Sequence, residues 1–390
     1  MLAEIKEHLA DKIIPFWRSM RDEACGGYYG YMGFDGCIDK TAEKGCILNS
    51  RIIWFFANAY EILKMPELLE EARHGLEFMK THCVDSEYGG LYWSVSYDGV
   101  PLDTTKHTYN QAFAIYALSS VYRITKETEY LKMAEELYDI IENNCRDWEG
   151  YLEAFDRKFR PVSNEKLSEN GVMAERTMNT LLHVFEAYTE LYRVTGRQDV
   201  KGKLEWMLEL IEERVYNFRL KRQEVFFDHE YKSLIDLHSY GHDIEAAWLI
   251  DRGIEILNET VCRDRMEPIT KMLTEQVYKT AFDGRSLANE CENGVVDEDR
   301  VWWVQAEGVV GFINGYQKDK NKKEYLEAAA RIWGFIREYV TDKREGMEWF
   351  WKVDAQGKPY QDKPIVEPWK CPYHNGRMCI EVIRRGINAT

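Results

Sequence analysis

The sequence lacks the features that mark secreted, membrane-spanning and nucleic-acid-binding proteins. Its nine cysteines form no C-x-x-C pair, and an odd number cannot all be bridged internally, so we expect reduced thiols in a cytoplasmic protein. The N-terminus has no basic, apolar signal peptide, and no stretch approaches the roughly 18 apolar residues of a membrane span. A net charge of -16 argues against nucleic acid or an anionic membrane as a partner. These absences favour a soluble protein with a small ligand.

Several catalytic motifs are also missing. The chain contains no G-x-S-x-G elbow, no phosphate-binding G-x-x-x-x-G-K-[ST] loop and no G-x-G-x-x-G dinucleotide loop. Serine hydrolases, phosphate-loop enzymes and nicotinamide enzymes are therefore disfavoured. What the chain does have is aromatic residues, 13% of the total, with 12 Trp and 24 Tyr. Such side chains suit stacking on a sugar face, although many are expected in the core.

Apolar residues spaced at i, i+3, i+4 and i+7 predict helices along the whole chain. Gly-aromatic clusters such as Gly26–Tyr31 and Gly346–Trp351 separate the helices into six pairs and are typical of short hairpins. A repeating unit of hairpin, helix, turn and helix predicts a closed architecture. We therefore expect an all-α fold, an (α/α)6 barrel of twelve helices with short β-hairpins in the connecting loops, and a single domain over residues 1–390. The predicted helices span 2–20, 47–64, 66–82, 107–125, 127–144, 174–195, 198–216, 239–258, 262–280, 301–317, 322–341 and 373–386.

The helix that follows each hairpin begins with polar or aromatic residues and continues with small or apolar ones. Helices of this kind bury most of their surface, so polar groups at one end of each are costly to desolvate unless they share a water-accessible pocket. The remaining helices, such as 127–144 and 198–216, carry Lys, Glu and Arg on one face and are predicted to form an outer ring. The six polar starts are Asn49–Arg51, His107–Asn110, Met178–Asn179, His238–His242, Val301–Trp303 and Pro372–Asn375.

Five histidines lie in or beside these helix starts: His107, His183, His238, His242 and His374. Imidazole has a pKa of about 6.5 and can both accept and donate a proton at cellular pH, which fits acid–base chemistry on a neutral substrate. Any one of them is more often a structural hydrogen-bonding group than a catalyst. Their gathering at one end of a barrel favours catalysis.

Two helical pairs admit more than one interpretation. His238 and His242 have the i, i+4 spacing of metal ligands, but no H-E-x-x-H glutamate and no third ligand accompany them, so the metal interpretation is weak. His242 with Glu245, at i, i+3, is better explained as a proton-transfer group beside a carboxylate that orients it or binds a hydroxyl. Asn179 and His183, at i, i+4, suit hydrogen bonds to sugar hydroxyls or a satisfied polar pair in the core.

The other candidate residues are an arginine and several aromatics. Arg51 could stabilise negative charge that develops on oxygen, or form a buried ion pair with a distant partner. Trp302 and Trp303 point about 100° apart on a helix, so one indole can stack on a substrate while the other packs. Glu307 lies one turn beyond Trp303, and Trp369 precedes His374 by five positions.

Four separated motifs together resemble the N-acylglucosamine 2-epimerase superfamily, and within it the branch that acts on cellobiose. They are Ser50–Arg51, Ser239–Glu245, Trp302–Glu307 and Trp369–Arg377, and the resemblance extends to Lys106–Tyr109 and Leu167–Gly171. It implies an (α/α)6 barrel that epimerises the reducing-end glucose of β-1,4-linked disaccharides such as cellobiose or lactose to mannose. It further implies no metal and no other cofactor. We expect the disaccharide to be the partner and the chain to be a monomer.

The resemblance also implies residue roles. One of the two histidines His242 and His374 opens the sugar ring and the other takes the C2 proton; which does which, and whether one or two bases act, stays open. The alternatives are an N-acylglucosamine 2-epimerase or mannose isomerase, a glycoside hydrolase using Glu245 with Glu307, and a non-catalytic sugar-binding protein. The implied catalytic residues are His242, His374, Arg51 and His183, and the implied substrate-binding residues are Tyr109, Asn179, Glu245, Trp248, Trp303, Glu307 and Trp369. Of these, Tyr109, Asn179, Glu245 and Glu307 are implied to bind hydroxyls or to orient the histidines.

Overall fold

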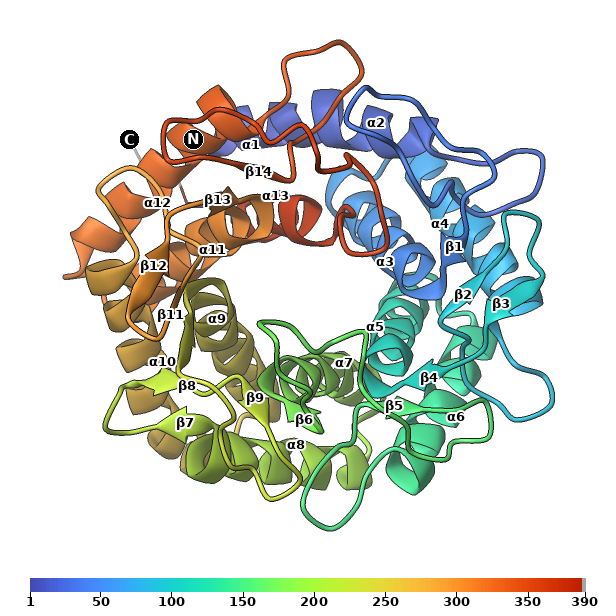
Figure 1. Cartoon of the computed structure of the whole chain (residues 1–390), viewed down its shortest axis with the longest axis horizontal. Helices are drawn as coiled ribbons and strands as arrows, with labels where there is room; N and C mark the ends of the chain where they lie inside the picture. The colour runs from blue at the N-terminus through green and yellow to red at the C-terminus, as the bar shows by residue number, and fades with distance from the viewer. Residues whose placement is uncertain (388–390) are drawn as a thin grey trace.

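Two concentric rings of helices make up the computed structural model, which describes residues 1–387 (Figure 1). Each inner helix packs against the next inner helix, and the last packs against the first, so the ring is closed. In the described part of the chain, each of the twelve predicted segments is helical, and the predicted barrel is confirmed. The inner helices are α3 (Cys46–Leu63), α5 (Thr108–Thr125), α7 (Met178–Thr195), α9 (Tyr240–Leu257), α11 (Trp302–Lys318) and α13 (Tyr373–Arg385).

The outer ring covers the inner one with amphipathic helices. Its first member consists of α1 (Leu2–His8) and α2 (Ile14–Ser19), joined by one π-helical turn at Leu9–Ile13. In α6, Tyr130, Ala134, Leu137, Tyr138 and Ile141 form the buried stripe, at the spacing expected of a helix with one face on a core. The other outer helices are α4 (Pro66–Phe78), α6 (Thr128–Asn144), α8 (Gln198–Leu210), α10 (Thr260–Thr280) and α12 (Lys323–Phe335).

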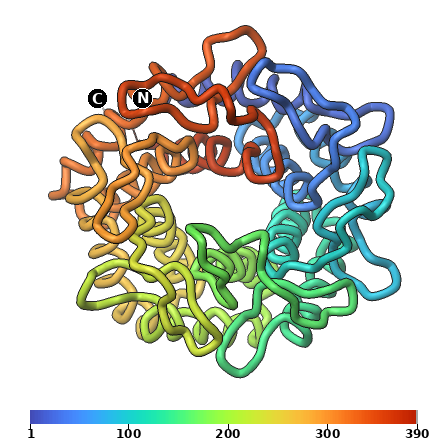
Figure 2. Tube along the Cα trace, viewed as in Figure 1, coloured from blue at the N-terminus to red at the C-terminus, as the bar shows by residue number. Residues whose placement is uncertain are grey.

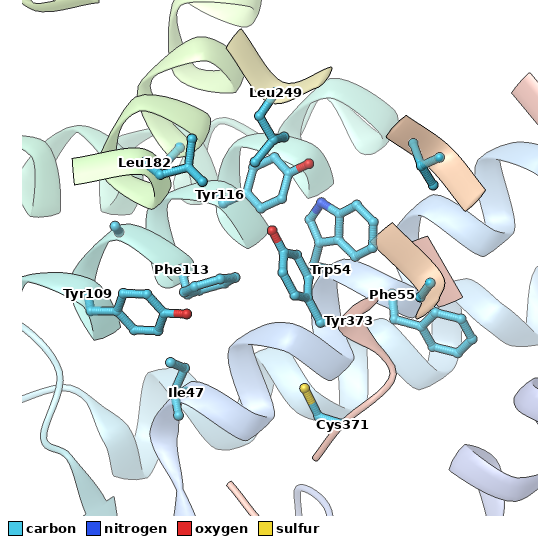
Figure 3. Packing of buried hydrophobic residues seen from close by; sticks show 14 of the residues in the cluster. Ile47, Trp54, Phe55, Tyr109, Phe113, Tyr116, Leu182, Leu249, Cys371 and Tyr373 are labelled. Carbon is cyan, nitrogen blue, oxygen red and sulfur yellow. The ribbon is translucent and has the colours of Figure 1, made fainter. Parts of the chain in front are cut away.

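Aromatic side chains fill the centre of the inner ring. Phe113 lies between Tyr109 and Tyr373, with ring centroids 5.0 and 4.8 Å away, and Trp54 stacks on Tyr116 at 5.3 Å (Figure 3). Aromatic pairs in this geometry contribute about 0.5–1.5 kcal/mol each beyond the area that they bury. Many of the aromatics are therefore core residues, as expected, and they form a rigid floor within the barrel.

Short strands link each loop to its neighbour around the ring. The Gly-aromatic clusters do form local bridges, for example Arg146 with Tyr151. However, β5 (Ala154–Phe155), which follows Tyr151 in the same connecting segment, pairs with β4 (Lys106–His107) of the preceding connection. In the same way β9 (Phe226–Phe227) pairs with β6 (Arg176–Thr177). The short hairpins expected in the connecting loops are present, for example β7 (Tyr216–Asn217) with β8 (Arg222–Gln223), and strand pairs between neighbouring connections join them around the ring. The remaining strands are β1 (Lys44–Gly45), β2 (Ser94–Val95), β3 (Pro101–Asp103), β10 (Leu237–Ser239), β11 (Glu290–Glu292), β12 (Val295–Asp297), β13 (Arg300–Val301) and β14 (Lys352–Val353).

This pairing changes one predicted helix boundary. The helix expected from residue 174 begins at Met178, because Arg176 and Thr177 are extended and paired with β9. The Thr177 hydroxyl then caps α7 by accepting a hydrogen bond from the Thr180 N–H at 3.0 Å.

The barrel closes where the chain's two ends meet, since α1 and α13 contact each other (Figure 2). Trp333 Nε1 donates to Glu4 at 3.1 Å, and Trp349 Nε1 donates to His8 Nε2 at 2.7 Å. Within residues 1–387, the structure contains no helix that is both long enough and apolar enough to cross a membrane.

Candidate active site

A cavity opens at the end of the barrel where the six inner helices begin. Every inner helix contributes to its wall, and the predicted meeting of the polar helix starts in one pocket is confirmed. Six helix N-termini at this end also favour negative charge in the cavity. Of the predicted site residues, Arg51, Tyr109, Asn179, His183, His242, Glu245, Trp303, Trp369 and His374 line the wall.

Two predicted substrate-binding residues lie behind that wall. Trp248 is fully buried, and its Nε1 donates a hydrogen bond to Glu307 Oε2 at 2.9 Å. Glu307 in turn lies beneath His374. Neither side chain is among the wall residues in the described part of the chain. Glu307 bonds His374, which fits the other role implied for it, that of orienting a histidine. Trp248 lies two turns below His242 on α9, which places its side chain in the core rather than at the mouth of the barrel.

Three histidines in the wall each have one ring nitrogen held by a neighbouring side chain. His374 Nδ1 lies 2.7 Å from Glu307 Oε1, and His183 Nδ1 lies 2.9 Å from Glu186 Oε2. His242 Nδ1 lies 2.7 Å from the hydroxyl of Ser239. The Nε2 atoms of His242 and His374 are left as the nitrogens that can exchange protons with a ligand.

Both of these histidines favour the neutral form. Burial lowers the pKa of His242 to about 3. Burial, reinforced by the positive charge of Arg377, lowers the pKa of His374 well below the ordinary histidine value. A neutral imidazole can act as a base.

A buried ion network supports the histidines from below. Arg377 donates to Glu186 Oε1 at 2.8 Å and to Glu307 Oε1 at 2.7 Å, and it also bonds Glu245. Although burial opposes ionisation, Arg377 and His183 lower the pKa of Glu186 to about 2. Burial and the charge of Glu307 raise the pKa of Glu245, so this carboxyl favours its protonated form. Glu245 Oε2 is buried with no hydrogen-bond partner among residues 1–387 and is available to a ligand.

The metal interpretations do not fit this geometry. His238 Nε2 bonds Asp243 Oδ2 at 2.9 Å while His242 bonds Ser239, so the predicted i, i+4 pair does not converge on one point. Glu245, Glu307 and His374 offer ligand atoms within 4.8 Å of one another. However, one nitrogen of Arg377 already bonds both carboxylates and supplies the positive charge there.

Arg51 is buried and has no ion-pair partner in the described part of the chain, so the alternative of a distant carboxylate is not realised. Its Nη2 donates to the Tyr109 hydroxyl at 2.8 Å and its Nη1 contacts Cys371 Sγ at 3.8 Å. The guanidinium lies 4.1 Å from the Phe113 ring. A buried, uncompensated positive charge at the cavity wall can stabilise negative charge on a ligand oxygen.

Trp303, Trp369 and Asn179 are the remaining predicted residues of the wall. Trp303 contacts both candidate acid–base residues, with ring centroids 4.8 Å from His242 and 5.4 Å from His374. Trp369 lies 6.0 Å from Tyr109 on the opposite side of the inner ring. Asn179 Oδ1 is buried without a hydrogen-bond partner in the described residues, so Asn179 and His183 do not form a satisfied core pair.

Sequence reasoning missed several residues of this site. Glu186 follows His183 by three positions and Arg377 follows His374 by three, so helical spacing could have found both. Tyr373, whose hydroxyl bonds Glu186, lies within the Trp369–Arg377 motif, but the resemblance implies no role for it. Wall residues from loops and strands had no periodic signal; they are Leu167, Glu169, Thr177, Val225, Phe226 and Trp351. Trp302, one of the two adjacent indoles noted in the sequence, also lines the wall.

The fold and this arrangement of histidines, arginine and carboxylates match a known class of sugar-modifying proteins. A sequence model of the N-acylglucosamine 2-epimerase (GlcNAc 2-epimerase) family matches residues 27–375, and the chain belongs to that family. It is 52% identical over 399 residues to the cellobiose 2-epimerase of Eubacterium cellulosolvens, covering 98% of both chains. It is 48% identical to the cellobiose 2-epimerase of Ruminococcus albus, covering 100% of both. The crystal structure of a sugar epimerase from a ruminal bacterium superimposes with a TM-score of 0.98, at 48% identity and 100% coverage of both chains.

Proposed function

We propose that the protein is an isomerase that epimerises C2 of the reducing-end glucose in cellobiose and related β-1,4-linked disaccharides. The product from cellobiose is 4-O-β-D-glucosyl-D-mannose. The observation that carries the proposal is the pair of buried histidines, His242 and His374, which both contact Trp303 and each keep Nε2 free. The cellobiose 2-epimerases that resemble the chain over its full length support the same substrate.

The first step is opening of the sugar ring, because C2–H is acidic only beside a free C1 carbonyl. His242 Nε2 accepts the O1 proton and delivers it to O5, so that the C1–O5 bond breaks and the carbonyl forms. The low pKa of His242 supports this role, since the imidazole is neutral before the transfer and neutral after it.

The second step is removal of the C2 proton by His374. Its Nδ1 lies 2.7 Å from Glu307, and the carboxylate stabilises the imidazolium that forms. His242 has the hydroxyl of Ser239 in that position instead of a carboxylate, which is why we place His374 at C2. The mannose epimer forms when a proton returns to the opposite face of C2, either from the His374 imidazolium after rotation about C2–C3 or from a second acid on that face, with His374 then losing its proton to solvent.

Between the two proton transfers a cis-enediolate must be held. Arg51, which has no carboxylate partner among residues 1–387, and His183 both line the cavity, and we assign them to the enediolate oxygens. Glu245, Tyr109 and Asn179 have polar atoms at the wall for sugar hydroxyls. Trp303 and Trp369 offer aromatic faces for the sugar rings.

The hydrolase alternative has less support. Glu245 and Glu307 bond the same nitrogen of Arg377, and Glu307 is not part of the cavity wall. A glycosidase needs two carboxyl groups on either side of the scissile bond, about 5 Å or more apart, with substrate between them.

Incubation with cellobiose in heavy water tests the proposal. We expect glucosyl-mannose carrying deuterium at C2, measured by NMR, and losses of about 10²–10⁴-fold in the His242→Ala and His374→Ala variants. Circular dichroism serves as the control that each variant is folded. A ketose labelled at C1 alone would instead identify an aldose–ketose isomerase, release of glucose a hydrolase, and binding without turnover a sugar-binding protein.

We also infer that the enzyme works as a monomer in the cytoplasm. The six inner helices of a single chain already form a closed ring around the cavity. All nine cysteines are free thiols, five of them buried. Light scattering coupled to size-exclusion chromatography gives the mass; a dimer that loses activity on dilution would contradict the monomer.

A further inference from the structure

The three histidines of the cavity wall differ in what holds their Nδ1 atoms. His374 and His183 have carboxylate partners, Glu307 and Glu186, whereas His242 has the hydroxyl of Ser239 at 2.7 Å. A carboxylate can only accept a hydrogen bond, so it keeps the proton on Nδ1 and leaves Nε2 as an acceptor in the neutral ring. A hydroxyl can donate or accept, so it is compatible with a proton on either nitrogen.

This difference matters for ring opening, where one group must first accept a proton from O1 and then donate it to O5. With a hydroxyl partner, Ser239 O–H can donate to Nδ1 while Nε2–H points to a sugar oxygen. The hydroxyl can equally accept from Nδ1–H while the Nε2 lone pair faces a sugar O–H. The neutral imidazole of His242 can thus bind either oxygen, and the transient imidazolium keeps its Nδ1–H bonded to Ser239 Oγ.

We propose that Ser239 is a positioning residue that lets His242 exchange the donor and acceptor roles of Nε2 during ring opening. This inference rests on the proposed function, because it assigns a task within that reaction. Ser239 itself does not contact the sugar, and it acts through the imidazole of His242.

The local structure holds Ser239 for this purpose. Ser239 is the residue before α9, where serine commonly caps a helix, yet its side chain makes no capping hydrogen bond and bonds His242 instead. Asp243 bonds both the residue before Ser239 and a residue of the neighbouring strand β8. It accepts from His238 Nε2 at 2.9 Å and from the backbone and side-chain N–H groups of Gln223 at 3.1 Å each.

The corresponding connections elsewhere in the barrel are built differently. Two residues before α5, Lys106 is fully buried and bonds Asp85 at 3.1 Å. Two residues before α7, Arg176 bonds Asp147 at 2.7 Å. Before α9 this position is His238, and its acidic partner lies on the helix itself. The ion pair that clamps the other connections is therefore replaced here by contacts that tie the Ser239 segment to the start of the His242 helix.

Enzyme-catalysed mutarotation of cellobiose tests the proposal, because interconversion of the anomers needs ring opening and closure but no chemistry at C2. We expect Ser239→Ala to lower both the mutarotation rate and kcat for epimerisation by about 10- to 100-fold, the cost of losing one buried hydrogen bond, with KM changed less than about threefold. The isotope effect with cellobiose deuterated at C2 of its reducing-end glucose should fall towards one, because ring opening becomes rate-limiting. Ser239→Thr keeps the hydroxyl and should restore most of the rate.

Ser119→Ala is the matched control. Ser119 is a fully buried serine on α5 whose hydroxyl has no partner among the described residues, so its loss should change neither rate. An unchanged mutarotation rate in Ser239→Ala would overturn the inference, and so would a lower kcat with an undiminished isotope effect. The wild-type protein is assayed first. Absence of epimerisation there refutes the proposed function, whereas normal wild-type activity with an unaffected Ser239→Ala refutes the role of Ser239 alone.

Discussion

The contact between Glu307 and His374 yields the sharpest prediction about the C2 step. Glu307→Gln keeps the size of the side chain and an oxygen that can accept from His374 Nδ1, but it removes the negative charge 2.7 Å from that nitrogen. A hydrogen bond to a charged group contributes about 1.5–3 kcal/mol. The charge of Glu307 makes this contribution only as the His374 imidazolium forms, so it lowers the barrier to removal of the C2 proton. At about 1.4 kcal/mol per tenfold change in rate, we expect kcat to fall about 10- to 150-fold.

The assay is the exchange of the C2 proton with heavy water, followed by NMR beside mutarotation of the same sample. Glu307→Gln should slow exchange while mutarotation stays within about threefold of the wild type, because His242 is bonded to Ser239 and not to Glu307. The control is Trp248→Phe, which removes the hydrogen bond to the other oxygen of Glu307 but keeps the charge. Trp248→Phe should slow the exchange of the C2 proton less than Glu307→Gln does, by about 10-fold or less. Equal slowing of both reactions in Glu307→Gln, or a near-normal exchange rate, would refute the assignment of His374 to C2.

Three further predictions follow from the site and the packing. Arg51→Met, which keeps much of the length but not the charge, should lower kcat about 10²- to 10³-fold, as removal of one oxyanion donor does; a variant that raises only KM would remove Arg51 from enediolate stabilisation. Because the pKa values of His242 and His374 are lowered, both bases stay unprotonated below the ordinary histidine range. The acid limb of kcat/KM should therefore lie below pH 6, and a limb at about 6.5 would contradict it. Gly311→Ala would place a methyl group 2.3 Å from Ile244 Cγ1 and should reduce the free energy of unfolding by about 1–3 kcal/mol, measured by urea denaturation.

The fold was largely predictable because its information is local. An outer helix such as α6 shows its buried stripe directly in the sequence, and the polar start of an inner helix such as α9 marks the end that faces the cavity. The strand partners were not predictable in this way. β4 pairs with β5 some fifty residues later, and two residues of strand carry no periodicity from which the partner could be read.

In the candidate site, contacts within one helix were predictable and contacts between helices were not. Side chains on one inner helix, such as His242 and Glu245, share a face because of helical spacing, and the sequence by itself placed them together. The family resemblance selected His242 and His374 from five histidines. Neither the helical spacing nor the resemblance paired Glu307 with His374, because the two residues are 67 positions apart and come from different helices.

Only the tertiary structure decided what each residue can do chemically. The sequence determined twelve helices and a ring of polar starts, because both follow from a repeat of 3.6 residues and from the cost of burying polar groups. The closure of the ring determined the rest: it left Arg51 without a carboxylate partner in the described part of the chain, placed Trp248 behind the wall, and set Arg377 among three glutamates. Protonation and hydrogen-bond partners depend on distances of a few ångströms between helices that the chain joins only through long connections, and those distances exist once the barrel has closed.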